Sequence, residues 1–193
     1  MNNIIDPIYK IKCSAASDIN EHLPTLYEYA LKVKTIVEFG TRHGCSTWAL
    51  MNSNPETIIS YDIIKQDGVD LLIEKAKEAN INYSFIESDT LSIEINKTDL
   101  LFIDTFHSYN QLYSELNKHH SNVNNYIIMH DTFTFGDVDM PKAGTVSPLL
   151  NKDITKQGLN NAIKDFLSSN KEWIIEKTFN NNNGLTILKK LIA

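Results

Sequence analysis

The sequence predicts a doubly wound α/β fold, in which helices cover both faces of a mostly parallel sheet. Short β-branched runs alternate with segments whose apolar residues recur at helical spacing, as in successive βαβ units. Gly40 and Gly44 follow the first β-branched run, where a strand would turn into a helix. The chain has 193 residues, of which 42% are hydrophobic. We therefore expect a single domain over residues 1–193 with one sizeable core.

Five runs are predicted to be strands, each ending before a turn or a helical pattern. They are expected at 35–39, 57–62, 82–87, 99–103 and 125–130.

Helical patterns precede and connect these strands. Apolar residues spaced from Ile19 to Val33 predict an amphipathic helix with Pro24 in its first turn, so residues 1–34 are expected to form a helical cap over the sheet or over a ligand. A second helix is expected after Asp67, which would cap it. Ser108 and the glutamine three positions later have the spacing of a capping box, which predicts another helix start.

The alternation stops at residues 132–153, a long segment containing glycines, prolines and acids. Such a connection is typical of a lid or a binding loop, and Phe133 and Phe135 could stack on a substrate or pack within the loop. A further helix is expected from Leu159. Two strand patterns joined by an asparagine-glycine turn then predict an antiparallel hairpin at the end of the sheet.

The charge and cysteine content limit the binding partners and the cellular location that can be expected. A net charge of −6 and a pI near 5.5, without a basic cluster, argue against nucleic acid or an anionic membrane as partner and favour a small molecule. Cys13 and Cys45 are far apart in the sequence, and we see neither a secretory leader nor a membrane-spanning run. A cytoplasmic location is therefore expected.

The first strand leads into a turn that predicts a ligand site. Its pattern is E-x-G-x-x-x-G-x-S, and Arg42 stands where a dinucleotide fingerprint would need its second glycine. A cofactor without phosphates needs no such close backbone approach. Glu38 offers an acceptor that could order a cationic amino-acid tail, directly or through water.

Four residues of this turn, Glu38, Gly40, Gly44 and Ser46, resemble the first motif of class I S-adenosylmethionine-dependent methyltransferases. The resemblance implies a Rossmann-like, seven-stranded mixed sheet with strand order 3-2-1-4-5-7-6. It also implies that S-adenosylmethionine binds over Glu38 to Ser46, a stretch that includes Thr41.

The same resemblance assigns the next two strand ends. Asp62, at the end of the second strand, lies at the interval where such folds bind ribose hydroxyls. Ser88 and Asp89, after the third strand, would lie beside the adenine. Asp89 could equally be a helix cap or a solvated loop acid.

Two acids close the fourth and fifth strands. Asp104 and Asp131 would be neighbours in a 3-2-1-4-5 sheet, where strands are about 4.8 Å apart. Two uncompensated carboxylates at that distance repel each other, so the pair predicts a shared cation.

The motifs I-D-x-x-H-x-Y and H-D-T resemble the macrocin O-methyltransferase and cephalosporin hydroxylase-like group over about Thr35 to Thr132. The resemblance implies that Asp104 and Asp131 bind Mg²⁺, that Asp104 also serves catalysis and the cofactor, and that His107 is a general base. Where relatives often have a second carboxylate, this chain has His130. It could be a metal ligand, a substrate contact or a packed residue, and an imidazole suits Mn²⁺ better than Mg²⁺.

These observations predict metal-assisted O-methylation of a small hydroxylated acceptor such as a sugar, a phenol or a natural product. A homo-oligomer could complete the acceptor pocket of so short a chain. Two alternatives stay open, because fold does not fix function. One is a cephalosporin hydroxylase-like enzyme with different chemistry, and the other is a non-catalytic cofactor-binding or assembly protein.

Overall fold

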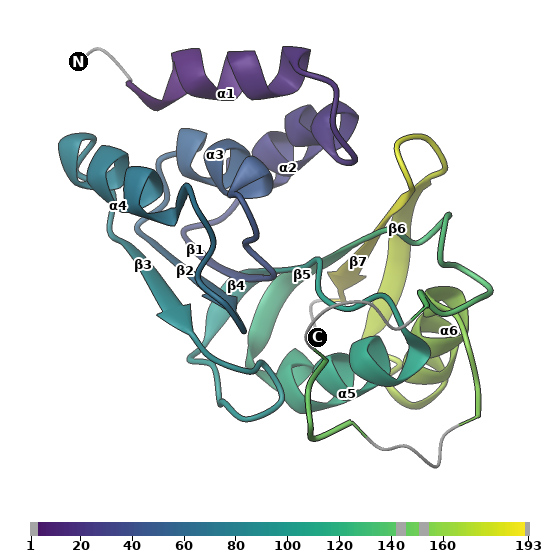
Figure 1. The fold of residues 1–193 in the computed structure, drawn as a ribbon. Coiled ribbons are helices and arrows are strands. Elements are labelled where there is room, and N and C mark those ends of the chain that lie inside the picture. The colour runs from purple at the N-terminus through teal and green to yellow at the C-terminus, as the bar shows by residue number, and fades with distance from the viewer. Residues whose placement is uncertain (1–3, 142–145, 151–154, 192–193) are drawn as a thin grey trace.

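A seven-stranded mixed sheet forms the centre of the molecule (Figure 1). The computed structural model describes residues 4–141, 146–150 and 155–191. The strand order is β3-β2-β1-β4-β5-β7-β6, as predicted. Strands β1 to β5 are parallel, while β7 runs antiparallel to both β5 and β6, which confirms the predicted hairpin. The strands are β1 (Thr35–Phe39), β2 (Thr57–Asp62), β3 (Tyr83–Glu87), β4 (Thr98–Ile103), β5 (Val123–His130), β6 (Trp173–Phe179) and β7 (Leu185–Lys190).

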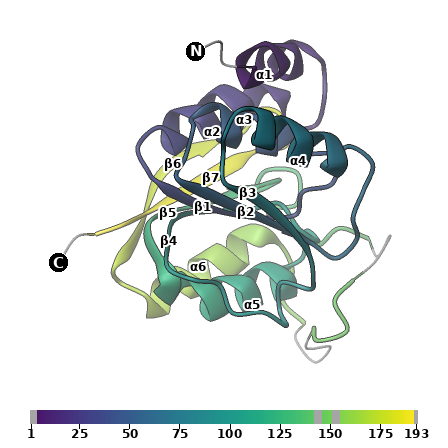
Figure 2. The same ribbon diagram turned by 90° about the vertical axis from the view of Figure 1, so that its left-hand side faces the viewer.

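Helices cover both faces of this sheet (Figure 2). One face carries α2, α3 and α4, with α1 as an outer layer over α2 and α3, while α5 and α6 cover the other. The helices are α1 (Ile5–Ser14), α2 (Leu23–Ala30), α3 (Cys45–Asn52), α4 (Val69–Glu78), α5 (Tyr109–His119) and α6 (Leu159–Ser169). Two 3₁₀ turns, η1 (Asn20–His22) and η2 (His120–Asn122), precede α2 and β5. Within the described residues, no helix has the length and apolar character needed to cross a membrane.

The core has two halves, one on each side of the sheet. Leu50, Leu72 and Phe102 are buried on the side of α1 to α4. Phe39 and Phe166 are buried on the side of α5 and α6. Because successive side chains of a strand point to opposite faces, the central strands contribute to both halves and contain long apolar runs.

Parallel pairing aligns the carboxyl ends of the three central strands. Phe39 of β1 pairs with Ile103 of β4, which pairs with Met129 of β5. The residues that follow these strands therefore lie side by side at one edge, where open α/β sheets bind their ligands. This register brings the predicted site residues together.

The N-terminal region differs from the prediction in detail. Helix α1 lies within the expected helical cap of residues 1–34 but was not predicted as a separate helix. The helix expected over Ile19–Val33 is a 3₁₀ turn followed by α2, which ends at Ala30. Pro24 lies in the first turn of α2, as expected. Since proline donates no hydrogen bond and clashes with the preceding turn, an α-helix through residues 19–23 cannot continue across it.

The predicted cap of α4 is wrong. The helix begins after Gly68, which has φ +101° and is the N-cap residue, and no side chain caps it. By contrast, Ser108 caps α5 as predicted, because its hydroxyl accepts a hydrogen bond from the backbone amide of Gln111.

The segment predicted as a lid begins directly after β5. Its residues 142–145 and 151–154 lie outside the described part of the chain. Asp139 holds the described part in place, because its carboxylate accepts hydrogen bonds from the backbone amides of Tyr109 and Gly158 at 2.8 Å each. The segment is thereby joined to the starts of α5 and α6.

Candidate active site

The turn after β1 depends on the close passage of β4. Gly40 has φ +83°, and a β-carbon at this position would lie 2.0 Å from the carbonyl oxygen of Asp104. Its amide donates to the carbonyl oxygen of Tyr61 at 2.8 Å. Only glycine fits both the left-handed backbone and the space. The turn and Asp104 are therefore in direct contact.

Glu38 lies beneath this turn and is fully buried. Its carboxylate accepts hydrogen bonds from the hydroxyls of Ser46 at 2.6 Å, Thr47 at 2.8 Å, and Ser60. Burial raises the pKa of Glu38 to about 7, although these three hydroxyls oppose the shift. Glu38 lines neither cavity described below, whereas Ser46 lines one of them. In this arrangement Glu38 orients the Ser46 hydroxyl, and it can influence a ligand in the cavity only through that residue.

Asp62, at the end of β2, organises the same turn. One carboxylate oxygen, Oδ2, accepts hydrogen bonds from the backbone amides of Thr41 at 2.9 Å and Arg42 at 2.8 Å. Arg42 has φ +48°, an uncommon conformation for a residue with a side chain, and the bond to Asp62 helps to hold it. Asp62 therefore has a structural role besides the one predicted for it.

Two adjoining cavities open at this edge of the sheet. The β3-side cavity has a volume of about 250 Å³, and the β5-side cavity has a volume of about 640 Å³. The β3-side cavity is lined in part by Asp62, Ser88, Asp89, Thr90, Phe106 and Gln111. The β5-side cavity is lined in part by Thr41, Ser46, His107, Asp131, Phe135 and Asn183. Residues shared by both are Gly40, Arg42, Asp104, Thr105 and Met140.

The predicted cofactor residues thus divide between the two cavities. Asp62, Ser88 and Asp89 face the β3-side cavity, and Thr41 and Ser46 face the β5-side cavity. The Thr41 hydroxyl is buried and has no hydrogen-bond partner among the described residues, so it could bind a polar ligand. An elongated ligand with one polar end in each cavity fits this division.

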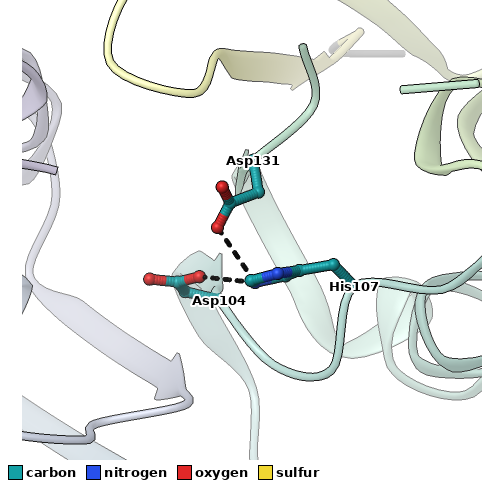
Figure 3. A group of neighbouring side chains, drawn as sticks. All are labelled: Asp104, His107 and Asp131. Atoms are coloured by element: carbon teal, nitrogen blue, oxygen red, sulfur yellow. Dashed lines mark hydrogen bonds and ion pairs between the residues drawn. The ribbon is translucent and has the colours of Figure 1, made fainter. Parts of the chain in front are cut away.

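Asp104, His107 and Asp131 meet where the cavities adjoin (Figure 3). Nε2 of His107 lies 3.1 Å from Oδ1 of Asp104 and 3.0 Å from Oδ2 of Asp131. Asp131 has φ +61°. Backbone strain of this kind is often found at functional sites.

Burial lowers the pKa of His107, but the two carboxylates outweigh burial and raise it to about 9. Burial alone would raise the pKa of each carboxyl. The neighbouring imidazoles instead hold the pKa of Asp104 and of Asp131 below the usual range.

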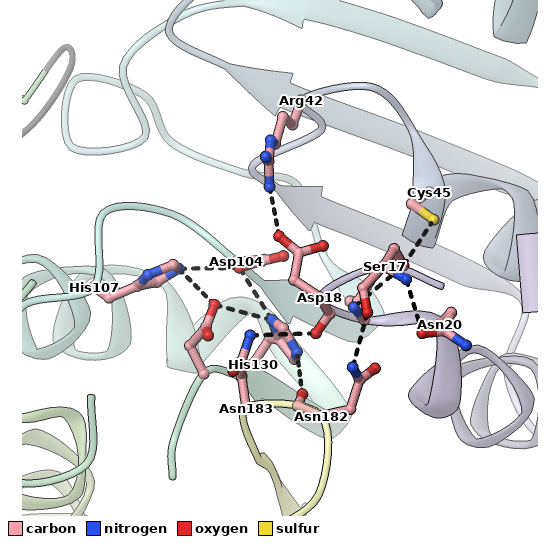
Figure 4. Close-up of polar contacts among 12 residues, drawn as sticks. Ser17, Asp18, Asn20, Arg42, Cys45, Asp104, His107, His130, Asn182 and Asn183 are labelled. Carbon is pink, nitrogen blue, oxygen red and sulfur yellow. Dashed lines mark hydrogen bonds and ion pairs between the residues drawn. The ribbon is translucent and has the colours of Figure 1, made fainter. Parts of the chain in front are cut away.

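His130 is a second imidazole against the same carboxylates (Figure 4). Its Nε2 lies 3.1 Å from the carbonyl oxygen of Asn182, a contact in which the nitrogen donates. Its Nδ1 lies at ion-pair distances of 3.0 Å from Asp131 and 3.5 Å from Asp104, without the angles of a hydrogen bond. Burial lowers the pKa of His130, yet the two carboxylates raise it to about 11. The two carboxylates therefore favour the protonated form of the ring, and the Asn182 carbonyl fixes its orientation.

The two acids are compensated, contrary to the premise of the sequence analysis. His107 and His130 supply positive charge to both, so carboxylate repulsion by itself does not require a metal. The donor set still suits a divalent ion, since ligand atoms of Asp104, His107 and Asp131 lie within 4.8 Å of one another. Two carboxylates with an imidazole match the preferences of Mn²⁺ or a similar transition metal.

An aromatic ring covers the imidazole of His107. The ring of Phe135 stacks on it with a centroid distance of 5.0 Å and an interplanar angle of 21°. The side chain of Phe133 is 60% exposed. Of the two phenylalanines singled out in the sequence, Phe135 belongs to the site.

Several contacts of the site carried no signal in the sequence. Arg42 forms an ion pair with Asp18 at 2.6 Å, so the segment before η1 contacts the glycine turn (Figure 4). The asparagine turn before β7 supplies Asn182 to His130 and Asn183 to the cavity. These contacts join segments far apart in the chain, whereas sequence patterns report only local structure.

Comparisons with known proteins identify the family and the fold of the chain. The family model described as rhamnosyl O-methyltransferase/CmcI matches residues 13–191. No curated protein sequence matches the chain.

Solved structures share the fold at low sequence identity. One is the 1,6-didemethyltoxoflavin-N1-methyltransferase of Burkholderia thailandensis, crystallised with S-adenosylhomocysteine, at 9% identity and a TM-score of 0.60, covering 93% of this chain and 80% of that one. The N-methyltransferase NodS of Bradyrhizobium japonicum WM9 has 11% identity and a TM-score of 0.58, covering 91% and 97%. The ribosomal protein L11 methylase of Lactobacillus delbrueckii subsp. bulgaricus has 13% identity and a TM-score of 0.58, covering 89% and 79%.

Proposed function

Because the chain belongs to the rhamnosyl O-methyltransferase/CmcI family and is an S-adenosylmethionine-dependent methyltransferase, we propose that it methylates a hydroxyl oxygen of a small acceptor. The observation that carries the proposal is the position of His107. Its imidazole borders the β5-side cavity, next to the junction with the β3-side cavity, between two carboxylates. A base at this position lies between the expected cofactor and the expected acceptor.

The cofactor side is assigned to residues that line the β3-side cavity and the turn. We assign the nucleoside part of S-adenosylmethionine to Asp62, Ser88 and Asp89, and its amino-acid tail to Thr41 and Ser46. The unpartnered Thr41 hydroxyl supports the second assignment. When bound, the cofactor supplies an electrophilic methyl group.

The acceptor side is assigned to the β5-side cavity. Nε2 of His107 carries a proton while it faces the two carboxylates, so His107 would act as the base only after losing that proton. The proton of the acceptor hydroxyl then goes to Nε2 as the oxygen forms its bond to the methyl carbon and the bond from that carbon to sulfur breaks. Asp104 and Asp131 orient the imidazole, and Phe135 covers its face. His130 remains a cation beneath the carboxylates and keeps them ionised.

A divalent cation is part of the proposal. The residues that would hold it are the carboxylates of Asp104 and Asp131. His107 keeps Nε2 for the proton of the acceptor, and Nδ1 of His130 would be a nitrogen donor only when that ring is neutral. When bound, it would orient and acidify the acceptor hydroxyl and offset the carboxylate charge that keeps His107 protonated. The carboxylates support Mg²⁺, and the imidazoles favour Mn²⁺.

The first test separates chemistry from binding. We expect His107→Ala to lower methyl transfer by about 10²- to 10⁴-fold, the usual contribution of a general base. The affinity for S-adenosylhomocysteine, measured by calorimetry, should change little. Turnover is followed as S-adenosylhomocysteine release with a panel of sugars and phenols, with and without Mg²⁺ or Mn²⁺.

The matched control is His120→Ala, because His120 packs on Phe166 away from both cavities. It should keep turnover and binding. If His107→Ala loses cofactor binding rather than turnover, the assignment of the base is wrong. Equal turnover after chelation and after addition of either ion would refute the role of the cation.

A further inference from the structure

Gln111 has a buried hydrogen-bond acceptor that nothing in the protein uses. The residue lies in the first turn of α5, is 4% exposed, and lines the β3-side cavity. Its amide oxygen Oε1 is buried and has no hydrogen-bond partner among the described residues. Because an unpaired buried acceptor costs free energy, this oxygen is better satisfied when a ligand brings a donor.

A carboxylate fixes the orientation of that amide. Nε2 of Gln111 donates to Oε1 of Glu115 at 2.8 Å and to the Thr90 hydroxyl at 3.2 Å. Glu115 is fully buried and also accepts from the hydroxyls of Thr90 at 2.6 Å and Thr105 at 2.9 Å. Rotating the Gln111 amide by half a turn would place its oxygen against the Glu115 oxygen. While Glu115 is ionised, the donor nitrogen therefore stays on it, and Oε1 has no partner among the described residues.

The position of Gln111 indicates which part of a ligand it could contact. In the β3-side cavity, Asp62 follows β2, while Ser88 and Thr90 follow β3 at the edge of the parallel sheet. If Asp62 binds a ribose, the base extends toward β3, where Thr90 and Gln111 line the same cavity. Gln111 presents an acceptor there, and an exocyclic amino group is the donor that complements it.

We propose that Gln111 makes this site selective for a 6-aminopurine, by accepting a hydrogen bond from the 6-amino group of the bound nucleoside. The assignment rests on the proposed S-adenosylmethionine binding. A 6-oxopurine would place an oxygen against Oε1 and leave both acceptors unpaired. Sites built to bind a donor discriminate strongly against ligands that lack it. Glu115 is a positioning residue in this arrangement.

Asp89 is the alternative hydrogen-bond acceptor for the 6-amino group. Both of its carboxylate oxygens are already engaged, Oδ1 with the Leu91 amide at 2.9 Å and Oδ2 with the Ser147 hydroxyl at 2.6 Å. Gln111 Oε1 has no such partner. The experiment therefore compares variants of both residues.

The experiment measures the affinities of S-adenosylhomocysteine and of S-inosylhomocysteine, its deaminated 6-oxo analogue, by calorimetry. For the unmodified protein we expect the adenosyl ligand to bind at least about tenfold more tightly. Gln111→Met keeps the side-chain length without the acceptor, and its preference should fall to within about threefold. Asp89→Asn tests the competing residue. Because Asp89 belongs to the assigned binding site, the affinities for both ligands can fall, but their ratio should stay near that of the unmodified protein.

Each outcome decides between the proposals. Equal binding of the two ligands by the unmodified protein overturns the role of Gln111. So does a preference that survives in Gln111→Met and is lost in Asp89→Asn, because Asp89 would then read the amino group. If Gln111→Met does not fold, the comparison of the two ligands on the unmodified protein still tests the selectivity. Failure of the unmodified protein to bind either ligand refutes the proposed function instead.

Discussion

At the scale of single residues, Gly40 allows the turn after β1 to lie directly against Asp104 at the end of β4. Its left-handed backbone and the nearby Asp104 carbonyl leave no space for a β-carbon. The same turn contains Gly44, whose β-carbon would meet the side chain of Leu72 at 2.4 Å. A leucine side chain can move, whereas the backbone of β4 cannot move without shifting Asp104. Adding a β-carbon at Gly40 should therefore disturb the site more than adding one at Gly44.

We expect Gly40→Ala to lower the free energy of unfolding by more than about 2 kcal/mol, because the strained φ and the backbone contact add. Gly44→Ala has a similar φ, +76° against +83°, and should cost less. Urea unfolding of both variants measures the difference. An equal loss of unfolding free energy in the two variants would show that the contact with the Asp104 carbonyl adds no cost at Gly40.

The positions of some site residues could be predicted from the sequence, but the surroundings of others could not. Asp104, His107 and Asp131 could be brought together in advance, because the ends of parallel strands share one edge and Ser108 marks the start of α5. The charge of His130 could not be predicted. It is set by the carboxylates of Asp104 and Asp131, whose distances to the ring follow from the folded structure.

At the scale of elements, the turn between β6 and β7 connects the acceptor side of the site to the N-terminal region. Asn182, Asn183 and Gly184 have φ values of +43°, +70° and +93°. Asparagine tolerates this left-handed region better than most residues, which explains the composition of the turn. The Asn182 side chain accepts from the Glu21 amide at 3.0 Å and donates to the Ser17 carbonyl at 2.9 Å.

We expect Asn182→Gly to loosen the segment before α2 while keeping the turn. Glycine accepts the positive φ and the carbonyl bond to His130, and only the two side-chain bonds disappear. Limited proteolysis should then cut faster between residues 14 and 22. The control is Asn80→Gly, an exposed position with φ +56° after α4. Equal cleavage of both variants would contradict the proposed connection.

Elements with strong periodicity were predicted well, and the N-terminal region was not. The first two strands were predicted with the bounds observed, 35–39 and 57–62, and the next three to within two residues at each end. Helix α1 was missed because its stretch contains Pro7 and has no polar N-cap. Its buried residues Ile5 and Tyr9 belong to the core on the side of α2 and α3. Tertiary packing, rather than local pattern, stabilises that helix.

At the scale of the whole molecule, several buried groups make stability depend on pH in the same direction. Burial raises the pKa of Glu38 and of Glu115 to about 7 each. The carboxylates raise the pKa of His107 and His130. A group with a raised pKa in the folded protein stabilises it fully below its unfolded pKa. That contribution is lost as the pH rises through the folded value. Unfolding free energy should therefore fall on the alkaline side.

Glu115→Gln tests one step of this dependence. Between pH 5 and pH 8 the unmodified protein should lose up to about 3 kcal/mol more stability than the variant, since the Glu115 pKa shifts from 4.5 to about 7. Urea unfolding at the two pH values measures the difference. Glu74→Gln, on the exposed face of α4, should follow the unmodified protein. Identical pH dependence in all three proteins would contradict the assigned pKa.

The asparagine turn also bears on the order in which the molecule can assemble. The hydrogen bonds that join it to residues 17–22 span separations of 159 to 165 positions. Contacts between such distant segments form slowly, because closing a long loop costs entropy before any contact offsets it. The parallel strands and the glycine turn need much shorter closures. A folding chain would therefore acquire the cofactor side first, and competence toward the acceptor would be the last property to appear.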